Sequence, residues 1–78
     1  MSSPPIDASI RDNLEVYFQD LEGTEPHALY DMVLKAVERP LLDVVMQKAD
    51  GNQSRAAEWL GINRNTLRRK LLEHKLID

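Results

Sequence analysis

The sequence predicts an all-α protein with four helices per chain. Apolar residues recur at helical spacing in two segments, Gly and Pro residues lie between the segments, and a glycine divides two short amphipathic stretches near the C-terminus. The 78 residues make one domain at most, and a chain of this size buries only about 60% of its unfolded surface. Since the chain has no Cys to form disulfides, self-association is the simplest further source of stability.

The first helix is expected over about residues 10–21. Residues 1–9 are rich in Pro and Ser and have no period, so they predict a flexible N-terminal arm. Ser9 is a plausible N-cap, and Gly23 follows where the helix would stop.

The second helix is expected over about residues 28–49, although Pro40 lies inside it. An interior proline removes a hydrogen bond, and two short helices are the alternative. The apolar residues nevertheless keep helical phase through Pro40, and no Gly, Ser or Asn marks an ending. We therefore predict one kinked helix. It would be too long for a monomer to cover, so a second face of this helix is expected to need a partner.

Residues 50–78 have the pattern of a helix-turn-helix. "DGN" at 50–52 breaks the chain, and helices are expected over about 53–60 and 64–74. Ala57 would lie where these helices cross, Gly61 would permit the turn, and Ile62 and Leu67 would pin the second helix to the first. Trp59 is expected to pack in the core or against the long helix.

Charge is divided unevenly along the chain, whose formal net charge is −3. Residues 1–54 hold ten acidic and four basic residues, whereas residues 55–78 hold six basic and three acidic ones. A basic C-terminal third is typical of a phosphate-binding surface, although a solvated helix face gives the same pattern.

The second helix of such a motif enters the major groove with its N-terminal part, where Arg can pair with guanine and Asn with adenine. Arg64, Asn65, Thr66 and Arg68 are the candidates here. Asn63 has two interpretations, as the N-cap of this helix or as a base contact. At the start of the preceding helix, Asn52 or Ser54 could cap the helix or bind a phosphate.

Other functional classes find little support in the sequence. No nucleophile, base and orienting group cluster, so we expect a non-enzyme without a cofactor. His27 and His74 stand alone and are expected to be surface residues, not metal ligands. The chain has no apolar run long enough for a membrane span and no apparent leader, so a soluble, cytoplasmic protein is expected.

The strings "LYDMVLKAVERPLLDVVMQ", "GNQSRAA" and "GINRNTLRRKL" resemble the Fis family of bacterial nucleoid-associated, DNA-bending proteins. The resemblance implies an intertwined homodimer with a four-helix core and a C-terminal helix-turn-helix on each subunit. It implies indirect readout of a compressed, A·T-rich centre of the DNA site. Double-stranded DNA would be the partner, with RNA polymerase as a further one. The expected DNA contacts are Asn52, Ser54, Arg55, Asn63, Arg64, Asn65, Thr66, Arg68, Arg69 and Lys70.

The resemblance further implies that residues 10–49 are dimerisation helices. Their interface is expected to contain apolar residues, namely Leu14, Tyr17, Phe18, Val33, Val37, Leu41, Leu42 and Val45. Leu72 and Glu73 stand where enteric members of the family carry lysines, so contacts to flanking DNA should be weaker. Two alternatives remain. One is a local promoter regulator like the C-terminal domain of enhancer-binding activators, and the other is a helical adaptor that binds protein.

Overall fold

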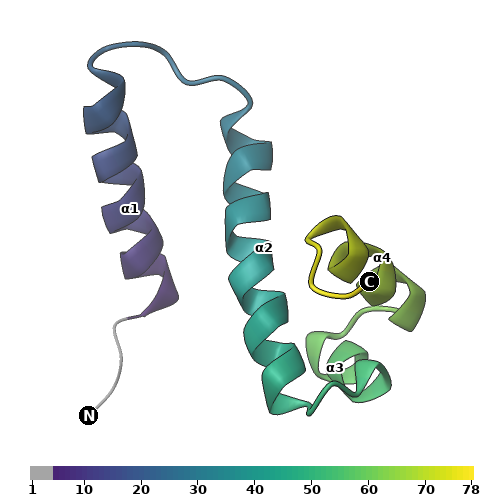
Figure 1. The fold of residues 1–78 in the computed structure, drawn as a ribbon. Coiled ribbons are helices and arrows are strands. Elements are labelled where there is room, and N and C mark those ends of the chain that lie inside the picture. The colour runs from purple at the N-terminus through teal and green to yellow at the C-terminus, as the bar shows by residue number, and fades with distance from the viewer. Residues whose placement is uncertain (1–4) are drawn as a thin grey trace.

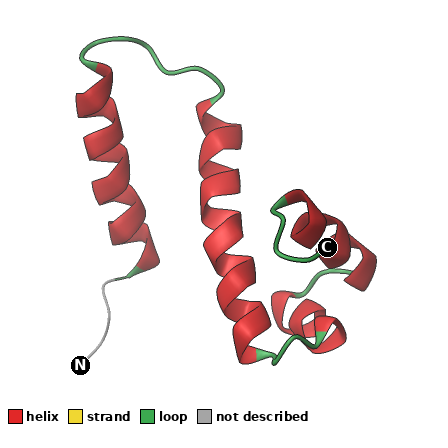
Figure 2. Cartoon of the chain, viewed as in Figure 1, coloured by secondary structure: helices red, strands yellow, loops and turns green. Residues whose placement is uncertain are grey.

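The computed structural model describes residues 5–78, and this part of the chain contains four α-helices and no strand. The helices are α1 (Ile6–Leu21), α2 (Leu29–Lys48), α3 (Gln53–Leu60) and α4 (Arg64–Glu73). In Figure 1, α1 and α2 run in opposite directions, and α3 and α4 lie beside the C-terminal half of α2, away from α1. Short loops connect all four helices (Figure 2).

Helix α1 begins earlier than the sequence pattern predicted. Its N-cap is Pro5, with φ −59°, and Asp7 lies in the first turn, where a negative charge favours the helix dipole. The prediction that Ser9 caps this helix is therefore wrong. Ser9 lies inside it, and its carbonyl accepts a hydrogen bond from Asn13 Nδ2 at 2.7 Å. Of the expected flexible arm, residues 6–9 are helical, and residues 1–4 lie outside the described residues.

Helix α2 continues through Pro40, which confirms one helix and excludes the two-helix alternative. Its 20 residues correspond to a length of about 30 Å. The kink at Pro40 stays a prediction. The helix ends at Lys48, and Asp50 and Gly51 take left-handed φ values of 54° and 77°. The Gly51 amide then donates to the Met46 carbonyl at 2.9 Å, a pattern that closes the ends of many helices.

A tight turn at Gly61 joins α3 to α4. Gly61 has φ 73°, a conformation that strains residues with a Cβ, and the Ile62 amide donates to the Ala57 carbonyl at 3.1 Å. Ala57 and Leu67 are both buried, as the spacing predicted. The buried contact between the two helices therefore contains the small Ala57 of α3 and Leu67 of α4.

The hydrophobic core lies where α2, α3 and α4 meet. It is formed by Leu42, Ala49, Ala56, Ala57, Leu67 and Leu71, with Leu76 and Ile77 of the C-terminal segment packed against it. The expectation that Trp59 packs in the core or against the long helix is wrong for this chain, because 55% of the residue is exposed. The neighbouring alanines of α3 turn inward instead, and their small side chains let α3 approach the core closely.

Helix α1 lies outside this core. None of its residues is buried. Between α1 and α2 lies a cavity of about 390 Å³, lined mainly by apolar side chains that include Leu14, Tyr17, Val33 and Val37. The radius of gyration is 15.1 Å, whereas a compact domain of 78 residues would have about 11.5 Å. The single chain is therefore extended and leaves apolar surface open on α1 and α2.

Candidate nucleic-acid interface

The packing of α4 determines which of its side chains face solvent. Leu67 and Leu71, one turn apart, are fully buried against α2 and α3. With this face turned inward, Arg64, Arg68 and Arg69 are exposed, and so is Asn65. Three guanidinium groups and an amide therefore lie on the open surface of one short helix.

Asn63 caps the N-terminus of α4. Its side-chain oxygen accepts a hydrogen bond from the Asn65 amide at 2.7 Å. The capping interpretation is therefore confirmed. Asn63 is nevertheless an exposed residue, and a base contact in addition to the cap remains a prediction.

Helix α3 has a similar cap. The Asn52 oxygen accepts from the Arg55 amide at 3.0 Å, so Asn52, not Ser54, is the N-cap. The two residues and Arg55 are exposed beside the positive end of the helix dipole. The exposed surfaces of α3 and α4 thus offer two helix N-termini with basic side chains close to each in sequence.

Two of the expected contact residues are less accessible. Thr66 is half-buried, and the Lys70 side chain is 29% exposed. Lys70 Nζ lies 2.7 Å from Oε2 of Glu38 on α2. The structure therefore directs the Lys70 ammonium group toward α2, unlike the three arginines of α4.

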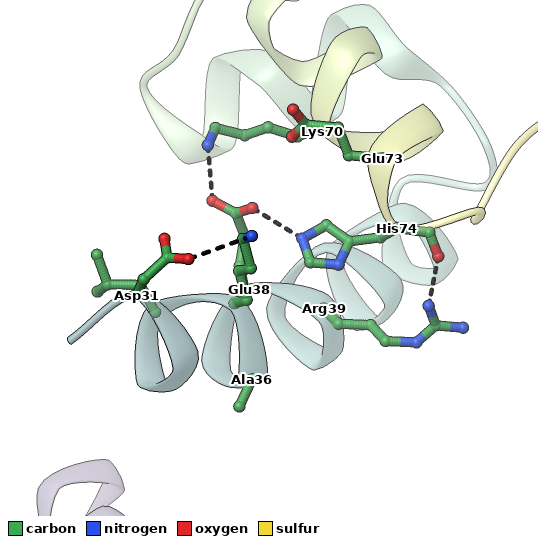
Figure 3. A pocket seen from close by; sticks show the side chains of 9 residues that line it. Asp31, Ala36, Glu38, Arg39, Lys70, Glu73 and His74 are labelled. Carbon is green, nitrogen blue, oxygen red and sulfur yellow. Dashed lines mark hydrogen bonds and ion pairs between the residues drawn. The ribbon is translucent and has the colours of Figure 1, made fainter. Parts of the chain in front are cut away.

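His74 was expected to be a surface residue, and this prediction is wrong. Its side chain is only 11% exposed, and Nε2 lies 2.8 Å from Oε1 of Glu38. Figure 3 shows the Glu38 carboxylate between Lys70 and His74, while the neighbouring Arg39 donates to the backbone carbonyl of His74. These side chains border a cavity of about 620 Å³ between α2 and α4. His27, in contrast, is exposed as expected.

Sequence reasoning missed Glu38. The hydrogen bond from Lys70, and then the one from His74, lower the pKa of the Glu38 carboxyl below its ordinary value of 4.5. The sequence did contain a signal that Glu38 faces α4, because Glu38 precedes the buried Leu42 by one helical turn. Lys70 and His74 are likewise one turn apart beside Leu71, but recognising the match requires knowing that α4 packs on α2.

The residues expected at a dimer interface differ in their surroundings. Leu42 is 2% exposed and lies in the chain's own core, because α3 and α4 cover that face of α2. Val45 packs against the same core. Phe18 and Leu41 are exposed, and the others are half-buried, namely Leu14, Tyr17, Val33 and Val37.

Within residues 5–78, no group of three or more His, Cys, Asp or Glu side chains is placed to hold a metal ion. None of the helices in that range is both long and apolar enough to cross a bilayer.

Comparison with known proteins identifies the family. Residues 33–74 match the family model described as bacterial regulatory protein, Fis family. The chain belongs to the Fis family. A protein of Ralstonia nicotianae described as a Fis-like DNA-binding protein is 58% identical over 77 residues, which are 99% of this chain and 100% of that protein.

Two further relatives extend the likeness. A Fis-like DNA-binding protein of Neisseria meningitidis serogroup A is 60% identical over 74 residues, 95% of this chain and 94% of that protein. DNA-binding protein Fis of Proteus mirabilis is 47% identical over 74 residues, covering 95% of this chain and 76% of that protein. The resemblance to Fis seen in the sequence is thus confirmed.

The part that matches the Fis family model contains the polar side chains that connect α2 to α4, namely Glu38, Arg39, Lys70 and His74. It runs from Val33 in α2 to His74 after α4, so it includes Glu38 and the exposed arginines. The Fis-family match therefore covers both the helix-turn-helix and the stretch of α2 on which it packs.

Proposed function

We propose that this chain is a dimeric, DNA-binding and DNA-bending regulator of transcription that associates with the nucleoid in the cytoplasm. The observation that carries the proposal is the arrangement of α4. Its Leu67 and Leu71 are buried, whereas Arg64, Arg68 and Arg69 are exposed. Exposed guanidinium groups on one helix suit a surface of phosphates and base edges.

Each exposed side chain of the motif has a chemical role in this proposal. Arg64, at the start of α4, donates two hydrogen bonds to O6 and N7 of a guanine, and Asn65 can pair with an adenine. Arg68 and Arg69 bind phosphates or further base edges. Arg55 and the N-terminus of α3 anchor the backbone of the DNA, since free amides and a positive dipole end favour anions.

A second copy of the chain is the proposed partner for the open apolar surface. Helix α1 has no buried residue, and exposed apolar side chains extend along both α1 and α2, among them Phe18, Met32, Leu41 and Val44. The long α2 helix and the cavity beside α1 leave room for helices of another subunit. A two-fold dimer would cover this surface and present two copies of α4 to one duplex.

Bending follows from the family resemblance. In Fis dimers the two recognition helices are closer than one turn of straight DNA, so the duplex must bend and its minor groove must narrow between the half-sites. A·T-rich central steps compress more easily than G·C-rich ones, which gives sequence preference without base contacts.

A gel-shift competition tests this function. Two duplexes with identical flanks carry either an A·T-rich or a G·C-rich centre. We expect tighter binding to the A·T-rich duplex, and circular-permutation mobility should show a bend. Equal tight binding would remove indirect readout from the proposal. Absence of binding to either duplex would contradict DNA binding and favour a protein-binding adaptor.

A further inference from the structure

Side-chain hydrogen bonds of Glu38 and Arg39 with Lys70 and His74 form a polar link between α2 and the C-terminal end of α4. Within residues 5–78, every side-chain hydrogen bond that joins two different helical segments runs between α2 and the C-terminal end of α4. Glu38 takes part in two of them, and the adjacent Arg39 makes the third. Leu42 of α2 and Leu71 of α4 also share the buried apolar cluster, but apolar contacts alone specify orientation less strictly than directional hydrogen bonds do.

Lys70 is the basic side chain of α4 that this link holds toward α2. Its ammonium group forms an ion pair with Glu38 at 2.7 Å, and both side chains are mostly shielded, with 29% and 27% exposed. The neighbouring Arg68 and Arg69 are exposed. The Glu38 carboxylate already neutralises the charge of Lys70 and holds its ammonium group toward α2, so the ion pair competes with a phosphate contact.

We propose that Glu38 is a positioning residue that fixes the orientation of α4 on α2 and withholds Lys70 from DNA phosphates. This inference rests on the proposed function. The same carboxylate thus favours sequence discrimination, by holding the arginines of α4 in one orientation, and limits non-specific affinity, by keeping one basic side chain per subunit out of the phosphate surface.

The test compares DNA binding by full-length variants over a range of salt concentrations. One duplex is selected by the wild-type protein from a random-sequence pool, and the other is a shuffled version of it. Glu38→Gln removes the charge but keeps the size of the side chain. Asp43→Asn is the matched control, because Asp43 is an exposed carboxylate on the same helix.

We expect Glu38→Gln to release Lys70. The slope of log K against log salt should become steeper by about 0.9 for each subunit, the value for one added phosphate contact. The ratio of affinities for the selected and shuffled duplexes should fall, since α4 is less firmly oriented. Asp43→Asn should change neither the slope nor the ratio.

Lys70→Gln separates the effect on the salt slope from the effect on the affinity ratio. Alone, it should leave the salt slope of the wild type unchanged. In the double variant Glu38→Gln/Lys70→Gln, the slope should return to the wild-type value while the ratio stays low.

Three results would overturn this role of Glu38. They are a Glu38→Gln variant that behaves like Asp43→Asn, a double variant that keeps the steeper slope, and a Lys70→Gln variant with a shallower slope than wild type. The last of these holds even if Glu38→Gln fails to fold, because it would show that Lys70 already contacts a phosphate. A wild-type protein that binds neither duplex would instead overturn the proposed function itself, and this role with it.

Discussion

Leu71 of α4 and Leu42 of α2 lie in one buried cluster, with exposed fractions of 0% and 2%. The two leucines join the helix-turn-helix to the long helix, although 29 positions separate them in the sequence. The orientation of the basic surface therefore depends on apolar packing as well as on the polar link at Glu38.

Leu71→Ala should destabilise the fold by about 2–5 kcal/mol, because it removes a fully buried side chain and leaves a cavity. Urea unfolding followed by circular dichroism measures this change. Leu72→Ala is the control, since Leu72 is the next residue and is exposed. A loss as small for Leu71→Ala as for Leu72→Ala would show that α4 is not held by this cluster.

Asn63→Ala should lower the free energy of unfolding by about 0.5–2 kcal/mol, because it removes the cap on the Asn65 amide. Asn63→Ser keeps a capping oxygen and should restore stability, but not the DNA affinity that the expected base contact of Asn63 supplies. Thermal unfolding and a binding titration on the same samples check both expectations. If serine restored affinity as well as stability, the Asn63 side chain would have no direct role on the DNA.

Phe18→Asp should convert a dimer to monomers, since Phe18 is exposed in one chain and is proposed to be covered by a second. Burying an unpaired carboxylate in that interface would be costly. Sedimentation velocity gives the oligomeric state. Val16→Asp is the control, because Val16 is also exposed on α1 but lies on the opposite side of the helix. A wild-type chain that sediments as a monomer, or equal effects of the two substitutions, would contradict the dimer.

Acid should weaken the contribution of Glu38 to stability. Its pKa is lowered below 4.5 in the folded protein, chiefly by the hydrogen bond from Lys70 and then by that from His74. The stabilisation is fully present above pH 4.5 and is lost as the pH falls through the lowered value. The difference in unfolding free energy between wild type and Glu38→Gln should therefore shrink on acidification. A difference that stays constant from neutral pH to well below 4.5 would contradict the ionised state of Glu38.

The helices of the C-terminal half were predictable because local signals mark their ends. Asn52, Gly61 and Asn63 each occupy the cap that their residue type favours. The start of α1 was missed because Ser9 is a better cap by type than Pro5, and residue type does not show which neighbouring site the backbone uses.

The surroundings of single side chains were harder to predict than the helices. A large aromatic residue favours a buried site in general, yet Trp59 is exposed because two alanines face the core from the same short helix. Charge counting placed Lys70 with the arginines, but it could not show that a carboxylate 32 positions away in the sequence would bind it. Such pairs depend on how two helices pack against each other, and a local sequence pattern does not predict that packing.

The most direct test of DNA binding through α4 is a salt series of fluorescence anisotropy titrations with the wild type and Arg64→Ala. We expect the affinity of the wild type to fall steeply with salt. On a panel of mutated half-sites, Arg64→Ala should cost about 1–3 kcal/mol on the preferred site and discriminate less among bases. Binding that is absent or insensitive to salt, or an Arg64→Ala variant with wild-type affinity on every duplex, would contradict this role of α4.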